Sequence, residues 1–376
     1  MPMQSLMILL VGVALLITGA IVLGRTVLSK ADYIVEEVTF NNGEVTLAGT
    51  LTLPAVAGQH PAVVLMTGTG PQDRDNVVVP RFRLFQQIAD YLTQNGIAIL
   101  RYDDRGVGAS GGVFEEASIY DFASDAAAAI AYLESRADIN PNQTGVLGHS
   151  EGGVYAAILG ADPDSGVDFI ISMAGPSIKG SDMLMEQNRL MLEAAGASEA
   201  LIKSQLAFLE TVIPLMIAQD YKAASQRTRE VALEQLEIAR KEGDPAIAQI
   251  KDENAYAQTV VDAFMTGYAN ASFSSLMAYD PGPNFAETTV PILAVFGELD
   301  LQVPPASNIV ALEVAFAKSD NDDVTIITIP GANHLFQAAT RGAATEYTTL
   351  KRTFTGEFLP TVSNWILERV DVVELK

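Results

Sequence analysis

The sequence predicts an α/β protein built on an open, mostly parallel β-sheet with helices on both faces. Short apolar runs that suit buried strands occupy residues 61–66, 97–100, 144–148, 169–173, 291–296 and 324–329. Segments with apolar residues at helical spacing separate them, which is the order of a parallel sheet. Between residues 34 and 53, alternating apolar and polar residues flank Asn41-Asn-Gly43 and predict an antiparallel hairpin. Ligands of such sheets bind beyond the carboxyl ends of the strands, so site residues are expected there.

Helices are predicted wherever apolar residues recur at helical spacing between these strands. Such spacing covers residues 82–92, 119–133, 309–316 and 362–369. Asn95-Gly96 follows the first of them and is a typical helix stop.

The alternation of strands and helices is interrupted between residues 177 and 285. This stretch reads as several amphipathic helices, with the charged run from Glu230 to Glu253 forming a solvated helix face. It is too long for a loop, so a helical cap, or lid, inserted into the core is expected. Six of the eleven methionines fall here, which suits either an adaptable apolar pocket or an ordinary helix core.

The chain is thus expected to have three parts. Residues 1–24 form a membrane anchor or signal segment, residues 31–176 and 286–376 form the α/β core, and residues 177–285 form the cap. Residues 1–24 carry no charged side chain, and Leu6–Leu23 would span roughly 27 Å as a helix. A buried soluble helix is the alternative. Thr18-Gly-Ala20 is a weak cleavage site, and Arg25 and Lys30 are too few to decide which side of the membrane the core occupies.

Composition excludes several classes of function. The formal charge is −23, so the surface repels nucleic acid and anionic lipid headgroups; a well-solvated acidic surface or adaptation to high salt would explain it. The absence of cysteine excludes disulfides and thiolate sites, and three histidines leave little for an imidazole-rich metal site.

Residues 148–152 read Gly-His-Ser-Glu-Gly, the G-x-S-x-G pattern of a nucleophile elbow. A buried strand precedes it and a small-residue helix, Gly152–Leu159, follows, so strand, turn and helix occur in the required order. Ser150 is therefore the candidate nucleophile. The amide of Glu151, at the start of the helix, would face a developing oxyanion.

A serine nucleophile needs a base, and His334 is the candidate by elimination. His60 precedes a strand and would lie at the opposite edge of the sheet, while the ring of His149 is expected to point away from Ser150. The orienting acid should follow the strand at 291–296, where both Glu298 and Asp300 occur. Asp300 is preferred, because Glu298 suits a role in capping or solvating the turn.

A second oxyanion donor is expected from the glycine-rich loop that follows the strand at 61–66. Thr69 is the first choice and Gly70 the alternative, with Gly68 also in the loop. The charged residues of this loop, Asp73, Arg74 and Asp75, are expected to form anchoring ion pairs. Asp103, Asp104 and Arg105 should brace neighbouring loops in the same way.

With these residues in place, the chain resembles the α/β-hydrolase superfamily and is similar to bacterial serine carboxylesterases and serine aminopeptidase-like hydrolases. The resemblance rests on Gly-Thr-Gly-Pro-Gln-Asp-Arg-Asp, Asp-Arg-Gly-Val-Gly-Ala-Ser, Gly-His-Ser-Glu-Gly, Gly-Glu-Leu-Asp and Ala-Asn-His, in family order. Thr67 departs from it, since many relatives carry histidine there. The resemblance implies an acyl-enzyme mechanism with no cofactor and no metal.

These observations lead to a membrane-associated or exported serine esterase that acts on a small-molecule ester. An aminopeptidase, or a thioester or amide hydrolase, would use the same triad. A non-catalytic binding protein on this fold is the alternative from another class, although it would be expected to have lost a triad residue. An epoxide hydrolase or dehalogenase would need an acid at position 150 instead of serine.

Overall fold

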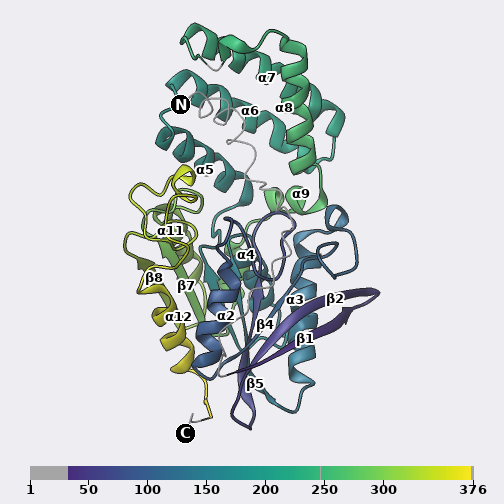
Figure 1. Ribbon diagram of the computed structural model, residues 1–376, viewed down its shortest axis with the longest axis vertical. Helices are drawn as coiled ribbons and strands as arrows, with labels where there is room; N and C mark the ends of the chain where they lie inside the picture. Colours follow the sequence, from purple (N-terminus) through teal and green to yellow (C-terminus); the bar gives the residue numbers. More distant parts are fainter. Residues whose placement is uncertain (1–32, 246, 374–376) are drawn as a thin grey trace. The chain divides into compact units, whose positions relative to one another are not determined.

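The computed structural model describes residues 33–245 and 247–373 (Figure 1). These residues form two compact units: a helical unit of residues 179–279, and an α/β core of residues 33–178 and 280–373. The predicted anchor or signal segment, residues 1–24, lies outside the described residues.

The described part of the core contains one eight-stranded sheet. Its strands are β1 (Tyr33–Asn42), β2 (Val45–Pro54), β3 (His60–Met66), β4 (Ala98–Tyr102), β5 (Ile139–His149), β6 (Phe169–Met173), β7 (Ile292–Gly297) and β8 (Val324–Ile329). Their order across the sheet is β1-β2-β4-β3-β5-β6-β7-β8. The pairs β1–β2 and β2–β4 are antiparallel, and all other pairs are parallel. The predicted mostly parallel sheet with an antiparallel N-terminal hairpin is confirmed.

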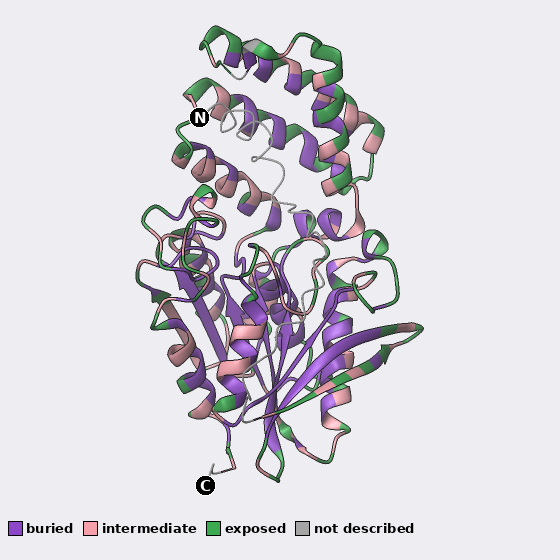
Figure 2. Ribbon diagram, viewed as in Figure 1, coloured by how far each residue is buried: buried purple, intermediate pink, exposed green. Residues whose placement is uncertain are grey.

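Two layers of helices cover the sheet. The core helices are α2 (Leu84–Gln94), α3 (Ile119–Glu134), α4 (Gly152–Ala161), α10 (Gly282–Glu287), α11 (Pro305–Phe316) and α12 (Phe358–Leu367), with the short 3-10 helices η1 (Phe114–Glu116) and η3 (Ala344–Glu346). Helices α2 and α12 share one apolar cluster with alternate strand residues such as Val63 and Leu65. The intervening strand residues face the other side, where α3, α4, α10 and α11 pack. The central strands are buried throughout their apolar runs (Figure 2).

The helical unit consists of α5 (Gly180–Ala194), α6 (Glu199–Ile217), α7 (Tyr221–Lys241), η2 (Ile247–Gln249), α8 (Glu253–Tyr268) and α9 (Ala271–Ala278). Its two ends meet, since the amide of Gly180 donates to the carbonyl of Tyr279 at 3.0 Å. Among the described helices, α6 alone is long and apolar enough to cross a membrane, by length and composition only, with a mean hydropathy of 1.5. Part of it is buried within the unit, including Phe208 and Val212.

The charged run from Glu230 to Glu253 was expected to be mostly a solvated helix face, and its first part lies on α7. The helix ends at Lys241, and Gly243 takes a left-handed conformation (φ +74°) just beyond it. One local prediction was wrong. Phe82 lies before α2 instead of in its first turn. It forms a bridge to Val79 around Arg81, whose φ is +69°. Phe82 is nevertheless buried in the same apolar cluster as the helix, so its position in the sequence fitted the helical spacing although it is not helical.

Candidate active site

The predicted elbow is a strained turn between β5 and α4. Ser150 has a φ of +56°, which non-glycine residues rarely adopt, and it is partly exposed between buried neighbours. A Cβ atom at position 148 would lie 1.9 Å from the carbonyl oxygen of Gly152, and one at position 152 would lie 2.4 Å from that of Met66. Both positions therefore require glycine if the strand, the turn and the helix are to pack this closely.

Asp300 and His334 meet in a buried hydrogen bond. Asp300 follows β7 and His334 follows β8, and the His334 Nδ1 atom lies 2.7 Å from Asp300 Oδ2. The other carboxylate oxygen accepts from the amides of Gln302 (2.8 Å) and Val303 (2.9 Å). Since a carboxylate only accepts, Nδ1 carries the proton and Nε2 is the basic nitrogen of the ring. The alternative acid, Glu298, is exposed and accepts from the amide of Gly331 at 2.7 Å, a role in the turn as predicted.

His149 connects the elbow to the His334 loop. Its Nε2 lies 3.1 Å from the backbone oxygen of His334, and the two rings are 4.9 Å apart between centroids. Burial, reinforced by the nearby His334, lowers the pKa of His149 to about 3, so the ring is neutral and Nε2 donates. The residue that precedes Ser150 thus bonds to the residue that would act as its base. Sequence reasoning missed this contact; a histidine inside a buried elbow was the available signal.

The loop after β3 passes directly over Ser150. A Cβ atom at position 68 would lie 3.1 Å from Ser150 Cβ, so Gly68 permits the close approach. Thr69 follows it and is exposed, and Gly70 adopts a φ of +86°. On the other side of Ser150, Glu151 begins the turn into α4, and its buried side chain accepts from the Tyr155 hydroxyl at 2.8 Å. The two predicted oxyanion elements therefore flank Ser150.

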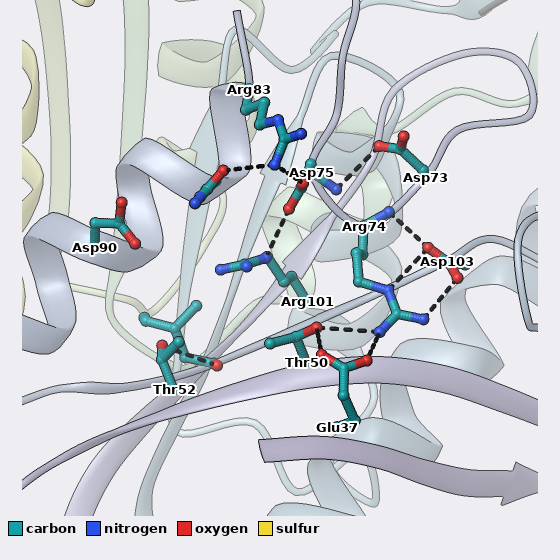
Figure 3. A network of polar contacts seen from close by, with 12 residues as sticks. Glu37, Thr50, Thr52, Asp73, Arg74, Asp75, Arg83, Asp90, Arg101 and Asp103 are labelled. Atoms are coloured by element: carbon teal, nitrogen blue, oxygen red, sulfur yellow. Dashed lines mark hydrogen bonds and ion pairs between the residues drawn. The ribbon is translucent and has the colours of Figure 1, made fainter. Parts of the chain in front are cut away.

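Ion pairs of Arg74 and Asp75 anchor this loop, as predicted, whereas the Asp73 carboxylate accepts a hydrogen bond from the backbone amide of Asp75 (Figure 3). Arg74 binds Asp103 through its backbone amide and its guanidinium, with a shortest contact of 2.7 Å. Burial favours a raised pKa for Asp103, but the hydrogen bonds and charge of Arg74 outweigh it and hold that pKa below its usual value. Asp75 pairs with Arg101 at 3.1 Å. These contacts fix the far end of the loop to β4.

The neighbouring Asp-Arg-Gly segment is braced in the same way. Arg105 donates to both oxygens of Asp125, a buried residue of α3, at 2.5 and 2.8 Å. The carboxyl of Asp104 accepts from the Thr67 hydroxyl and the Gln72 amide. No group of three or more histidine, aspartate or glutamate side chains suited to a metal ion occurs in residues 33–245 and 247–373.

Comparison with known proteins places this geometry in context. The chain is 26% identical over 314 residues to Esterase EstD of Thermotoga maritima, a match that covers 83% of this chain and 63% of that protein. An esterase of Pyrococcus furiosus has a TM-score of 0.53 at 14% identity, covering 92% of this chain and 95% of its own. Proline iminopeptidase of Mycobacterium smegmatis has a TM-score of 0.52 at 17% identity, covering 89% and 98%. At these identities the likeness to solved structures establishes the fold alone.

The family model described as serine aminopeptidase, S33, matches residues 81–338, a span that includes the elbow and the loops of Asp300 and His334. More than half of the chain lies within this match. Together with the sheet order, it shows that the protein belongs to the serine aminopeptidase S33 family of α/β hydrolases.

Proposed function

We propose that this protein is a serine esterase that cleaves carboxylic esters through an acyl-enzyme intermediate. The observation that carries the proposal is the strained Ser150 elbow, joined through His149 to a histidine that is hydrogen-bonded to a buried aspartate. A nucleophile, a base and a group that orients the base are the parts that acyl transfer needs.

In the proposed mechanism, the Ser150 hydroxyl attacks the ester carbonyl while His334 Nε2 takes its proton. Asp300 keeps the other nitrogen protonated and stabilises the imidazolium. The amides of Thr69 and Glu151 bind the oxyanion of the tetrahedral intermediate. His334 then gives its proton to the departing alcohol, which leaves an acyl group on Ser150. A water molecule, deprotonated by His334, hydrolyses this ester and regenerates the serine.

Support for an ester substrate comes from the relative named an esterase. The chain spans less than two thirds of that relative's length, so the activity is transferred only as a proposal. An aminopeptidase is the second candidate, because the family model carries that description. An aminopeptidase would additionally need a carboxylate to hold the free amino terminus of its substrate.

The remaining parts of the chain receive proposed roles as well. The helical unit leaves the core after β6, at the edge of the sheet where Ser150 and His334 lie, and returns before β7. We propose that it acts as a lid and sets the preference for acyl chain length. The uncharged residues 1–24 are proposed to anchor the protein in a membrane or to export it.

The test is a panel of p-nitrophenyl esters of rising chain length beside aminoacyl arylamides, with Ser150→Ala as the matched inactive control. An esterase hydrolyses the esters with much the higher kcat/KM, and Ser150→Ala lowers kcat by roughly 10⁴–10⁶-fold. A preference for the arylamides would favour the aminopeptidase. Full ester turnover by Ser150→Ala would refute the proposal.

A further inference from the structure

A second buried carboxyl lies beneath the loop that covers Ser150. Asp104 directly follows the bracing Asp103 at the end of β4, and it is almost completely buried. One of its oxygens is 2.7 Å from the Thr67 hydroxyl, and the other accepts from the Gln72 amide at 2.9 Å. A buried carboxyl with two satisfied contacts is a rigid support, because any rearrangement would leave a buried polar group without a partner.

These contacts hold both ends of the short segment that carries Thr69. Thr67 lies immediately before Gly68, which touches Ser150. Gln72 is tied to Asp104 twice, since the Asp104 amide also donates to the Gln72 carbonyl at 3.1 Å. The Gln72 side chain then reaches back and donates to the Thr69 carbonyl at 3.0 Å. Asp104 thus fixes the peptide units on either side of the proposed oxyanion donor.

The charge environment of Asp104 differs from that of Asp103. Asp103 has the guanidinium of Arg74 as its counter-ion, whereas both hydrogen-bond partners recorded for the Asp104 carboxyl are neutral. The titratable groups that act on Asp104 are Glu151 of the elbow, Asp125 of α3, Tyr102 of β4 and Tyr155 of α4. Burial, aided by the negative charges of Glu151 and Asp125 and opposed by the two hydrogen bonds, raises the pKa of Asp104 to about 8.

We propose that Asp104 is a positioning residue of the oxyanion loop, acting through Thr67 and Gln72 to hold the Thr69 amide toward the oxygen of the carbonyl group that Ser150 attacks. This role rests on the proposed function, because it presupposes that Ser150 is acylated.

The protonation state of Asp104 gives the proposal a signature that a merely structural role lacks. The recorded geometry has the Thr67 hydroxyl donating to Asp104, the arrangement that an ionised acid requires. A protonated Asp104 can reverse this bond and donate to the Thr67 hydroxyl while its other oxygen still accepts from Gln72. When the acid ionises, the hydroxyl must donate, and a buried negative charge then opposes the developing oxyanion. Turnover should therefore decline with an apparent pKa near 8, in a manner that depends on Asp104.

The experiment compares five variants of the full chain. Thr67→Val and Asp104→Leu remove the support, Thr67→Ser keeps the hydroxyl, Asp104→Asn mimics the neutral acid, and Thr52→Val is the matched control. Thr52→Val deletes a buried hydroxyl contact of the same kind, 2.7 Å from Thr93, in the same core. For each variant, kcat and KM on a short-chain ester are measured across pH 6–10, together with melting temperature and the extent of fluorophosphonate labelling of Ser150.

We expect Thr67→Val and Asp104→Leu to lower kcat by roughly 10- to 100-fold with little change in KM, while Ser150 is still labelled to completion. Thr67→Ser, which restores the hydroxyl, should recover most of the loss. Asp104→Asn should keep its kcat at neutral pH and lose the decline near pH 8. Thr52→Val should lower the melting temperature without lowering kcat.

The proposal is overturned if Thr67→Val has the same kcat as Thr52→Val, or if Asp104→Asn keeps the alkaline decline. Thr67→Val decides the matter even if Asp104→Leu does not fold. If wild-type Ser150 is itself not labelled, the proposed function fails; if it is labelled and the variants match the control, only the positioning role fails.

Discussion

Replacing Asp300 by asparagine should disable the base while leaving the fold intact. The carboxylate makes three contacts: His334 Nδ1 at 2.7 Å, and the amides of Gln302 and Val303 at 2.8 and 2.9 Å. In the variant, the single amide oxygen stays with the two backbone donors. The amide nitrogen then faces His334 and donates to Nδ1, which must accept.

This reversal places the ring proton on Nε2, the nitrogen that must receive the proton of Ser150. The wrong tautomer costs about 10³–10⁴ in kcat in a triad of this kind, or about 4–5.5 kcal/mol of transition-state stabilisation. The assay is kcat on a short-chain p-nitrophenyl ester near neutral pH, with a thermal melt to confirm folding. Glu298→Gln is the matched control, since this exposed carboxylate lies on the same turn and contacts only the Gly331 amide among the described hydrogen bonds. A loss of less than tenfold in Asp300→Asn, or an equal loss in Glu298→Gln, would refute the reasoning.

Three further predictions concern other parts of the chain. The pKa of His149 in the folded protein, about 3, lies below its value in the unfolded chain. Above about pH 6.5 the ring is neutral in both states, and its titration does not affect the free energy of unfolding. As the pH falls from there toward 3, the free energy of unfolding decreases by about 1.4 kcal/mol per pH unit, because only the unfolded chain takes up the proton. Urea unfolding near pH 6 and pH 4 should therefore show a smaller loss for His149→Gln than for wild type, and equal losses would contradict it. Replacing residues 179–279 by a short linker should change chain-length preference while Ser150 stays reactive; an unchanged preference in a folded variant would remove the proposed lid role. A chain that begins at Lys30 should stay soluble and keep its kcat/KM, whereas the full chain should sediment with membranes or be exported. If the truncated chain did not fold, both the proposed anchor role and the proposed export role of residues 1–24 would be contradicted.

Much of the core could be predicted because its signals are local. The predicted strand at 169–173 coincides with β6, since a buried parallel strand is a continuous apolar run. The strand at 324–329 coincides with β8, but its predicted burial was wrong: β8 lies at the edge of the sheet, and only Ile329 in it is buried. Helix α3 begins at Ile119 because Ser118 and Asp121 form a capping box there. The start of β5 at Ile139 was missed, because polar residues and a proline separate Ile139 from the apolar run that follows, and Ile139 pairs with His60 of β3, far away in the sequence.

The site shows the same division between local and distant signals. The Ser150 turn could be predicted because it requires glycine at positions 148 and 152, and both glycines belong to one local sequence pattern. The contacts of His149 with His334, and of Asp104 with Thr67, join segments that are 185 and 37 residues apart. Such contacts depend on how the loops pack against one another at the edge of the sheet. A pattern within a single segment of the sequence cannot predict this packing.

Covalent labelling tests the central claim most directly. Wild type and the Ser150→Ala and His334→Ala variants are treated with a fluorophosphonate, digested and mapped by mass spectrometry. If Ser150 is the nucleophile and His334 its base, the peptide that contains Ser150 gains one phosphonyl group in wild type, gains none in Ser150→Ala, and gains it far more slowly in His334→Ala. A label on another serine, or ester turnover by Ser150→Ala at the wild-type rate, would contradict the assignment.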